Sequence, residues 1–367
     1  MLHPSLLCLL CILCCGQTSF AQRLKSPEVN ENGTVTIRLI APKAESIKVR
    51  ISRVPDGQFE LTKNDRGMWE GTSASLPAGI HEYSLIVDGT KQLDPHNRWI
   101  KKWYTLDCLV EVPGKTPLLS ESQAVPHGAL HIHTYRSSIT DTDRKLVVYT
   151  PPGYETAEQE RYPVVYLLHG FGDDQLAWTE VGRANLIADN LIAQKKIPPM
   201  IIAMPYGHPE PLPYGDRDPK YGPENDAKMN DDMMKDVVPM TDRLYRTDPV
   251  ARQRAIVGLS MGGGHSLGIG LKNLDSFNWI GAFSAAAPMP SSLNSELDDL
   301  SQNPEKLSTL WIACGDKDFL LQRNHQFVEA LKEKEIEHEY WESQGAHNWS
   351  VWRDDYLPKF LQVVFQD

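Results

Sequence analysis

The sequence predicts an α/β protein with a doubly wound, mainly parallel sheet, preceded by a small Ig-like β-sandwich. From residue 144 onward, apolar runs typical of buried strands alternate with helical stretches, which is the pattern of βαβ units. Between residues 34 and 112, short runs alternate apolar and polar residues and are separated by turn signals, as in small sandwiches.

The N-terminus carries an apolar run, SLLCLLCILCC, followed by polar and small residues that end at Ala21. This layout is typical of a cleaved secretory signal peptide, and the run is too short to span a bilayer as a helix. We therefore expect residues 1–21 to be removed from a secreted or periplasmic protein. Four of the six cysteines lie in this segment, so we expect Cys108 and Cys314 to be free thiols without a disulfide framework.

Residues 22–115 are predicted to form the sandwich domain. Turn signals such as Pro55-Asp56-Gly57 and Asp88-Gly89 separate its strands. The predicted strands cover residues 34–42, 46–54, 68–76, 81–89 and 107–112. The segment PGKTP at 113–117 ends this pattern, and a second domain is predicted from 120 to 367.

The second domain alternates strands and helices to its end. Its predicted strands cover residues 144–151, 162–170, 199–205, 254–260, 279–286, 308–318 and 337–344. Its predicted helices cover 181–194, 231–246, the stretch after Ser260, 323–335 and the C-terminal residues. A polar loop is predicted over 206–228, and Pro239 is expected to bend the helix that follows it. The formal net charge of −11 argues against a nucleic-acid partner, because phosphates would be repelled.

The stretch GLSMG at 258–262 places Ser260 between two glycines. The bare pattern also fits a glycine-rich turn without chemistry. Here, however, a buried strand precedes the serine and a helix follows it, which is the setting of the nucleophile elbow in α/β-hydrolases. Gly258 and Gly262 are expected because side chains there would collide across the sharp turn. The N–H of Met261, at the start of the helix, is a candidate oxyanion donor.

A nucleophilic serine requires a base and a group that orients the base. In α/β-hydrolases both follow the serine along the chain. His347, in the loop after the last strand, is the candidate base. Asp318 in ACGDKD is the candidate acid, with Asp316 as the alternative, because Asp316 follows a glycine and could simply shape a turn. The N–H of Phe171, in HGFG at 169–172, is the candidate second oxyanion donor.

The second domain resembles carbohydrate esterase family 1, the feruloyl and acetylxylan esterases, with the related enterochelin esterases. The resemblance rests on VVYTPPGY, YLLHGFGDD, VGRANLIADNLIA, MIIAMPYGH, RAIVGLSMGGGHSLGIGL, IACGDKD and GAHNWSVWR, which cover nearly all of residues 127–367. It implies an α/β-hydrolase with Ser260 as nucleophile, His347 as base and Asp318 as orienting acid.

The first domain resembles the early-set sandwich of family-48 carbohydrate-binding modules through LPAGIHEYSLIVDGTKQLDP. Lys91 and Gln92 stand where glycogen-binding members tend to carry a tryptophan, which argues against starch-like binding. Its aromatic residues could stack on sugars, or they could be core and interdomain packing.

Aromatic residues are predicted to surround the substrate. The candidates, which flank the catalytic loops or lie in the loop expected over the sheet edge, are Trp178, Tyr206, Tyr214, Tyr221 and Trp349. Their rings could hold a planar phenolic acyl group or a sugar, or merely pack the loop. A hydroxycinnamoyl ester is favoured over an acetyl ester, because an acetyl group has no planar surface to contact.

His131 and His133 alternate along a predicted strand and face one side of it, as a metal pair would. No third ligand is evident nearby, and surface histidines explain the pair more simply. The sequence contains no cofactor motif, and ester hydrolysis by a serine requires neither a cofactor nor a metal.

The sequence therefore predicts a secreted serine esterase that hydrolyses feruloyl or acetyl esters on plant cell-wall polysaccharide such as xylan, through an acyl-enzyme. A siderophore esterase of the enterochelin type is the alternative enzyme. A non-catalytic carbohydrate-binding protein on a hydrolase scaffold is the alternative from another class.

Overall fold

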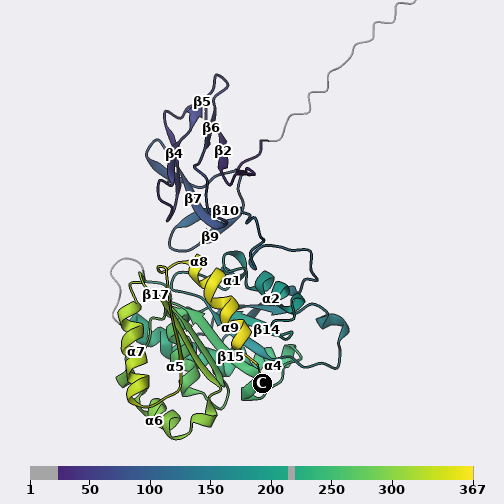
Figure 1. Ribbon diagram of the computed structural model, residues 1–367, viewed down its shortest axis with the longest axis vertical. Helices are drawn as coiled ribbons and strands as arrows, with labels where there is room; N and C mark the ends of the chain where they lie inside the picture. Colours follow the sequence, from purple (N-terminus) through teal and green to yellow (C-terminus); the bar gives the residue numbers. More distant parts are fainter. Residues whose placement is uncertain (1–23, 214–219, 367) are drawn as a thin grey trace, which may run out of the picture.

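The computed structural model describes residues 24–213 and 220–366 of the chain, so the predicted signal peptide and Tyr214 lie outside the described residues. Figure 1 shows a small β-rich part formed by the N-terminal residues and a larger part in which helices cover both faces of a sheet. Within the described residues, no helix is long and apolar enough to cross a membrane. Cys108 and Cys314 are both buried free thiols, as predicted.

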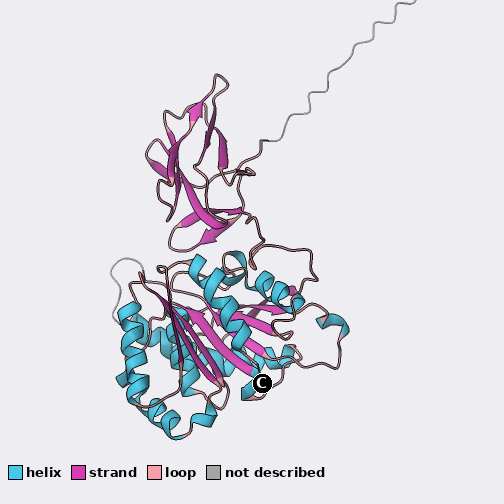
Figure 2. Cartoon of the chain, in the orientation of Figure 1, coloured by secondary structure: helices cyan, strands magenta, loops and turns pink. Residues whose placement is uncertain are grey.

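The N-terminal part consists of two antiparallel sheets (Figure 2). The first sheet has the order β1 (Glu28–Val29), β2 (Val35–Ile40), β6 (Met68–Thr72), β5 (Thr62–Lys63). The second has the order β4 (Gln58–Glu60), β3 (Ile47–Ile51), β7 (Gly79–Val87), β10 (Leu106–Val112), β9 (Ile100–Lys102), and β8 (Thr90–Gln92) pairs with β7. Apolar side chains of both sheets, such as Ile37, Val49 and Leu85, are buried together. The predicted sandwich is confirmed, because alternate residues of the strands form this shared core.

The larger part is built on one eight-stranded sheet. In spatial order its strands are β11 (Ala129–Arg136), β12 (Asp143–Thr150), β14 (Ile201–Pro205), β13 (Val164–Leu168), β15 (Arg254–Leu259), β16 (Trp279–Phe283), β17 (Thr309–Gly315) and β18 (Glu339–Ser343). The pairs β11–β12 and β12–β14 are antiparallel, and every other neighbouring pair is parallel. The predicted doubly wound, mainly parallel sheet is confirmed.

Helices pack on both faces of this sheet. The α-helices are α1 (Ala177–Glu180), α2 (Ala184–Ala193), α3 (Tyr221–Asp232), α4 (Val238–Leu244), α5 (Met261–Lys272), α6 (Asn294–Gln302), α7 (Leu321–Glu333), α8 (Trp349–Val351) and α9 (Leu357–Val363). Alternate side chains of the central strand β13 enter two separate cores. Val164, Tyr166 and Leu168 pack with residues of α3 to α7. Val165 and Leu167 pack with residues of α1, α2, α8 and α9, so the strand is buried on both faces.

The loop predicted over 206–228 is shorter in the structure, because α3 begins at Tyr221. Its buried residues, Asn225, Met229 and Asp232, have helical spacing, but two of the three are polar. The apolar stripe that normally reveals a helix is therefore missing.

Pro239 lies in the first turn of α4, and the helix widens into a π-helical turn, Met233–Val237, directly before it. A proline has no N–H to donate to the preceding turn and its ring crowds that turn. The same arrangement recurs at Pro358 of α9, which follows the π-helical turn Trp352–Tyr356. Each of these prolines is thus the second residue after a π-helical turn.

Candidate active site

Ser260 lies at a sharp turn between β15 and α5. Its φ of 54° and ψ of −114° lie outside the regions that non-glycine residues ordinarily adopt. A Cβ added at Gly258 would lie 2.6 Å from the carbonyl of Gly262, and one added at Gly262 would lie 2.5 Å from Leu168 O. The sheet holds the serine in place, because Ser260 N–H donates to Phe283 O at 2.8 Å. This is the geometry of a nucleophile elbow.

Ser260, His347 and Asp318 form a hydrogen-bonded chain. Ser260 Oγ donates to His347 Nε2 at 3.0 Å, and His347 Nδ1 donates to Asp318 Oδ2 at 2.9 Å and Oδ1 at 3.0 Å. The three residues follow β15, β18 and β17 respectively, so they meet at the carboxyl edge of the parallel sheet. Such a chain can support attack by the serine oxygen while the imidazole takes its proton.

The two candidate acids, Asp318 and Asp316, differ in their burial and in their hydrogen-bond donors. The Asp318 side chain is fully buried. Burial raises the pKa of its carboxyl, but hydrogen bonds from His347 and from Leu320 N–H at 2.8 Å outweigh burial, and the pKa lies below its ordinary value. Asp316 is exposed and accepts from Gly345 N–H at 2.9 Å. Asp318 is therefore placed to orient the imidazole, and Asp316 shapes the loop that carries it.

The segment His169–Gly172, here called the HGFG loop, passes close to Ser260. A Cβ added at Gly170 would lie 3.5 Å from Ser260 Cβ, and Phe171, the candidate donor, is the next residue. Met261 begins α5 directly after Ser260, so its N–H belongs to the first helical turn, where N–H groups and the helix dipole favour an anion. The two candidate oxyanion donors thus lie on the HGFG loop and at the start of α5, which meet at the serine.

The N-terminal sandwich contacts the HGFG loop. Trp103 Nε1 donates to Phe171 O at 2.7 Å, and the rings of Tyr104 and Phe171 lie 5.3 Å apart. Nearby, Trp99 Nε1 donates to Glu180 O at the end of α1, at 3.1 Å. Trp103 and its acceptor are 68 positions apart in the chain, and no local pattern in the sequence links them.

Two of the predicted substrate-binding aromatics are wrong. Trp178 is 1% exposed and Trp349 is 4% exposed, and their rings pack edge to face with centroids 5.1 Å apart. Trp178 Nε1 donates to Leu168 O at 2.9 Å, so its polar edge is used inside the fold. Both rings belong to the hydrophobic core on one face of the sheet, and a buried ring has no surface to offer a substrate.

Tyr206 and Tyr221 are partly exposed and lie beside the HGFG loop. The Tyr206 ring stacks on His169 with centroids 5.7 Å apart, and the Tyr221 ring lies 5.7 Å from the Phe171 ring. These two of the predicted aromatics therefore border the site.

Sequence reasoning missed Phe319. This residue directly follows Asp318, is 76% exposed, and its ring lies 4.5 Å from the His347 ring. The only signal in the sequence is its position next to the candidate acid. An exposed phenylalanine at this place offers an apolar, planar surface beside the reacting groups.

His131 and His133 have separate partners. His131 Nε2 forms a hydrogen bond with Thr150 Oγ1 at 3.0 Å, and His133 Nε2 forms one with Tyr245 Oη at 2.5 Å. Across residues 24–213 and 220–366, no group of three or more His, Cys, Asp or Glu side chains could hold a metal ion.

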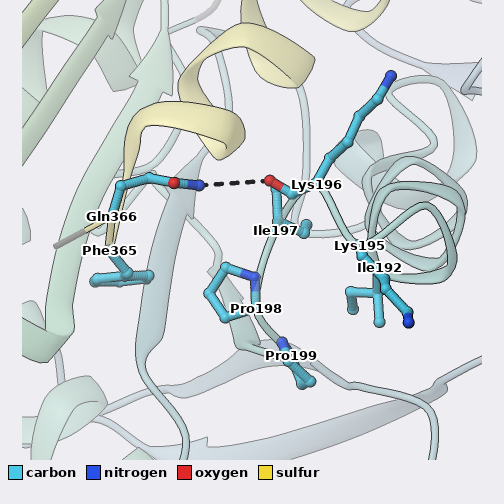
Figure 3. A pocket seen from close by; sticks show the side chains of 8 residues that line it. All are labelled: Ile192, Lys195, Lys196, Ile197, Pro198, Pro199, Phe365 and Gln366. Atoms are coloured by element: carbon cyan, nitrogen blue, oxygen red, sulfur yellow. Dashed lines mark hydrogen bonds between the residues drawn. The ribbon is translucent and has the colours of Figure 1, made fainter.

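A surface pocket of about 470 Å³ is lined by residues at the end of α2 and near the C-terminus, and Figure 3 shows their side chains. It is bordered by Ile192 of α2, by Lys196 and Pro198, and by Phe365 near the C-terminus. The segment that carries Lys196 and Pro198 leads into the amino end of β14, which is the sheet edge opposite the serine. None of the candidate site residues lines this pocket.

The family described as "Putative esterase" matches residues 137–362, which is more than half of the chain and includes all three residues of the hydrogen-bonded chain. The chain belongs to this esterase family. The resemblance of its second domain to carbohydrate esterase family 1 is confirmed by relatives and by solved structures.

The relatives that match this chain include two that are named as esterases. An "Endo-1,4-beta-xylanase/feruloyl esterase" of Xylanibacter ruminicola is 32% identical over 349 residues, which cover 93% of this chain and 46% of that protein. The chain thus spans about half the length of that relative. An "Acetyl esterase" of Caldicellulosiruptor saccharolyticus is 23% identical over 243 residues, covering 57% of this chain and 84% of that protein.

Some solved structures match about two thirds of this chain, and others match about nine tenths of it. A ferulic acid esterase of carbohydrate esterase family 1 from Anaeromyces mucronatus, in complex with ferulic acid, is 26% identical with a TM-score of 0.57, and the match covers 67% of this chain and 93% of that one. An enterochelin esterase from Shigella flexneri has a TM-score of 0.64 over 91% of this chain and 93% of that one. Its identity of 15% shows a shared fold alone.

Proposed function

We propose that this esterase hydrolyses carboxylic esters through an acyl-enzyme, with Ser260 as nucleophile, His347 as base and Asp318 as the orienting acid. The observation that carries this proposal is the hydrogen-bonded chain of the three side chains. Ser260 Oγ attacks the ester carbonyl, its proton goes to His347 Nε2, and the alcohol leaves with that proton. Water then gives a proton to the same nitrogen and attacks the acyl group, which releases the acid and regenerates the serine. The N–H groups of Met261 and Phe171 stabilise the oxyanion in both steps.

We propose that the substrates are acyl esters on plant cell-wall polysaccharide such as xylan, with feruloyl groups preferred to acetyl groups. Relatives named as feruloyl or ferulic acid esterases support this choice. The exposed ring of Phe319 beside the base also supports it, as does the contact between Tyr104 of the sandwich and Phe171 of the HGFG loop. A planar phenolic group gains contact area from such rings, whereas an acetyl group does not.

We expect kcat/KM to be about two- to tenfold higher for methyl ferulate than for acetylated xylo-oligosaccharide, because one aromatic contact contributes about 0.5–1.5 kcal/mol beyond burial. The measurement uses one enzyme preparation and both substrates. Phe319→Ala should lower kcat/KM for the ferulate ester and leave that for the acetate ester nearly unchanged. Release of acetate about a hundredfold more efficiently than ferulate would overturn the preference and leave the catalytic assignment in place.

A siderophore esterase is the second candidate, because the enterochelin esterase structure matches 91% of the chain and therefore includes the sandwich. Enterobactin added to the same assay tests this candidate, and a higher kcat/KM on it than on methyl ferulate would favour it. A non-catalytic carbohydrate-binding protein would release no p-nitrophenol from p-nitrophenyl acetate.

We also propose that residues 1–21 are a cleaved signal peptide, followed by domains at 22–115 and 120–367, in a secreted or periplasmic protein. The small residues that end at Ala21 support the cleavage site. The sandwich ends with Val112 of β10 and the large sheet begins with Ala129 of β11, which supports the domain division. N-terminal sequencing of the exported protein should begin at Gln22, and a retained Met1 would contradict the proposal.

A further inference from the structure

Two buried histidines outside the proposed catalytic chain lie beside the HGFG loop. His169 begins this loop after β13, and His208 ends the segment Tyr206–His208 after the neighbouring strand β14. Their side chains are buried, with 1% and 3% of the residue exposed, and their ring centroids are 5.4 Å apart. The mechanism proposed above uses neither of them.

Each histidine accepts a hydrogen bond from a glycine N–H in the other segment. Gly207 N–H donates to His169 Nε2 at 2.8 Å. Gly172 N–H donates to His208 Nε2 at 3.1 Å. Because a backbone N–H can only donate, both Nε2 atoms must be unprotonated, and each neutral ring carries its hydrogen on Nδ1.

The Nδ1 atoms have partners that suit this tautomer. His169 Nδ1 donates to Gly170 O at 2.8 Å, and His208 Nδ1 donates to Tyr221 Oη at 2.6 Å. All four ring nitrogens are therefore used, and each ring orientation is fixed by two hydrogen bonds.

The segment that carries His208 is itself fixed. Arg144 donates to the carbonyls of Tyr206 and His208 and is held by an ion pair to buried Asp232 at 3.1 Å. Asn225 Nδ2 donates to the carbonyl between them at 3.2 Å. This segment is thus a firm support against which the HGFG loop can be positioned.

We propose that His169 and His208 form a reciprocal clasp that positions the HGFG loop so that Phe171 N–H points at the oxyanion. They are positioning residues, and the proposal rests on the esterase function proposed above. The peptide between Phe171 and Gly172 is held at both ends, because its C=O accepts from Trp103 and its N–H donates to His208. The adjoining Phe171 N–H then has little freedom to move, which is what a preorganised oxyanion donor requires.

The clasp depends on both imidazoles being neutral. Burial lowers the pKa of His169 to about 4 and that of His208 to about 2. The charged and titratable groups that face the pair are Arg144, His265, Tyr206 and Tyr221. Protonation of either ring would replace its Nε2 acceptor with a donor and break the bond to glycine.

The sign of the pH effect on stability follows from these pKa values. The unfolded chain binds protons at both histidines below about pH 6.5, whereas the folded chain does not bind them until about pH 4 or lower. The unfolded state therefore binds more protons in this window, and the free energy of unfolding falls as the pH falls from 6.5 toward 4. Above pH 6.5 the two histidines make no such contribution to the pH dependence.

A matched pair of variants tests the clasp. His208→Gln places an amide oxygen near the position of Nε2, and His208→Met has the same length but only a weak acceptor. With p-nitrophenyl acetate, we expect His208→Met to lose about 10²-fold in kcat and His208→Gln less than about tenfold, with KM changing by less than about threefold in both. The loss should appear in kcat and not in KM, because the oxyanion forms only in the transition state and the tetrahedral intermediate, and not in the bound substrate. The same pair at His169 should behave alike. His325→Met is the control, because His325 is an exposed residue of α7.

Binding of phenylboronic acid, which forms a tetrahedral adduct with a serine oxygen, gives a readout that general loss of structure would not reproduce. Its affinity should fall across the variants in proportion to kcat/KM, while product inhibition by ferulate stays constant. Equal kcat values for the Gln and Met variants, or a change confined to KM, would overturn the clasp.

A measurement on the unmodified protein covers the case in which the variants do not fold. Long-range ¹H–¹⁵N spectra should show two histidines in the Nδ1–H tautomer between about pH 5 and 8, since both pKa values lie lower. An Nε2–H tautomer, or a titration of either ring near neutral pH, would contradict the clasp. This result is independent of ester hydrolysis, so failure of the clasp and failure of the esterase function can be distinguished.

Discussion

Ser260→Ala should abolish ester hydrolysis and leave the fold intact. Loss of the nucleophile in a comparable serine hydrolase costs on the order of 10⁶ in kcat. The Ser260 side chain donates to His347 Nε2, and the turn itself is held by backbone bonds to Phe283 and Ala286. Removal of the hydroxyl therefore takes away the reacting atom and leaves the elbow in place. The measurement is the burst of p-nitrophenol from p-nitrophenyl acetate, together with the thermal unfolding midpoint.

The control for this variant is Ser266→Ala, a buried serine in the same helix whose Oγ donates to Gly262 O at 2.7 Å. It removes a hydroxyl six residues, or about 1.7 helical turns, beyond the nucleophile, and it should keep kcat within about threefold of the unmodified enzyme. If Ser260→Ala retained more than about a tenth of the activity, the assignment of the nucleophile would be wrong.

Asp318→Asn should lower kcat by about 10⁴, whereas Asp316→Asn should change it by less than about fivefold. The amide at position 318 favours the tautomer of His347 with hydrogen on Nε2, which cannot accept the proton of Ser260. At position 316 the amide oxygen can still accept from Gly345 N–H, as the carboxylate does. Saturating p-nitrophenyl acetate gives kcat for both variants under the same conditions.

The two aspartates lie only two residues apart in one loop, so each variant is the control for the other. A large loss of kcat at Asp316 with a small one at Asp318 would show that Asp316, and not Asp318, orients the imidazole. Equal, modest losses would show that neither carboxylate orients the imidazole. The hydrogen bonds at 2.9 and 3.0 Å from His347 Nδ1 to Asp318 are the reason to expect the large loss of kcat at Asp318.

The serine, the histidine and the acid could be placed from the sequence because each follows a strand of the parallel sheet. The residues after parallel strands meet at one edge of the sheet. The strands before Ser260 and Asp318 are buried and appear as apolar runs, whereas β18, before His347, is a largely exposed edge strand. The choice between two aspartates needed the structure, because their order in a tight loop does not reveal which carboxylate points inward.

Side-chain direction accounts for most of what the sequence did not reveal. Trp178 and Trp349 flank the catalytic loops in the chain, yet their rings turn into the core. Phe319 turns outward although it adjoins buried Asp318. Helix α3 was missed because it buries polar residues, and the hydrogen bond from Trp103 to the HGFG loop joins two domains. Local patterns describe periodicity and turns, and they contain no information on such long-range contacts.

The bond between Trp103 and Phe171 O bears on how such two-domain esterases can be recombined. A crossover in the linker at 113–117 would separate the indole from the carbonyl that it holds, because the donor lies before the linker and the acceptor after it. A hydrolase domain joined to a different sandwich would keep the acceptor, Phe171 O, near the proposed nucleophile, but it would lack the donor, Trp103 Nε1. The linker therefore divides the sequence into two parts, but the hydrogen bond from Trp103 to Phe171 O still joins these parts beside the proposed active site. We expect the two parts to be inherited together.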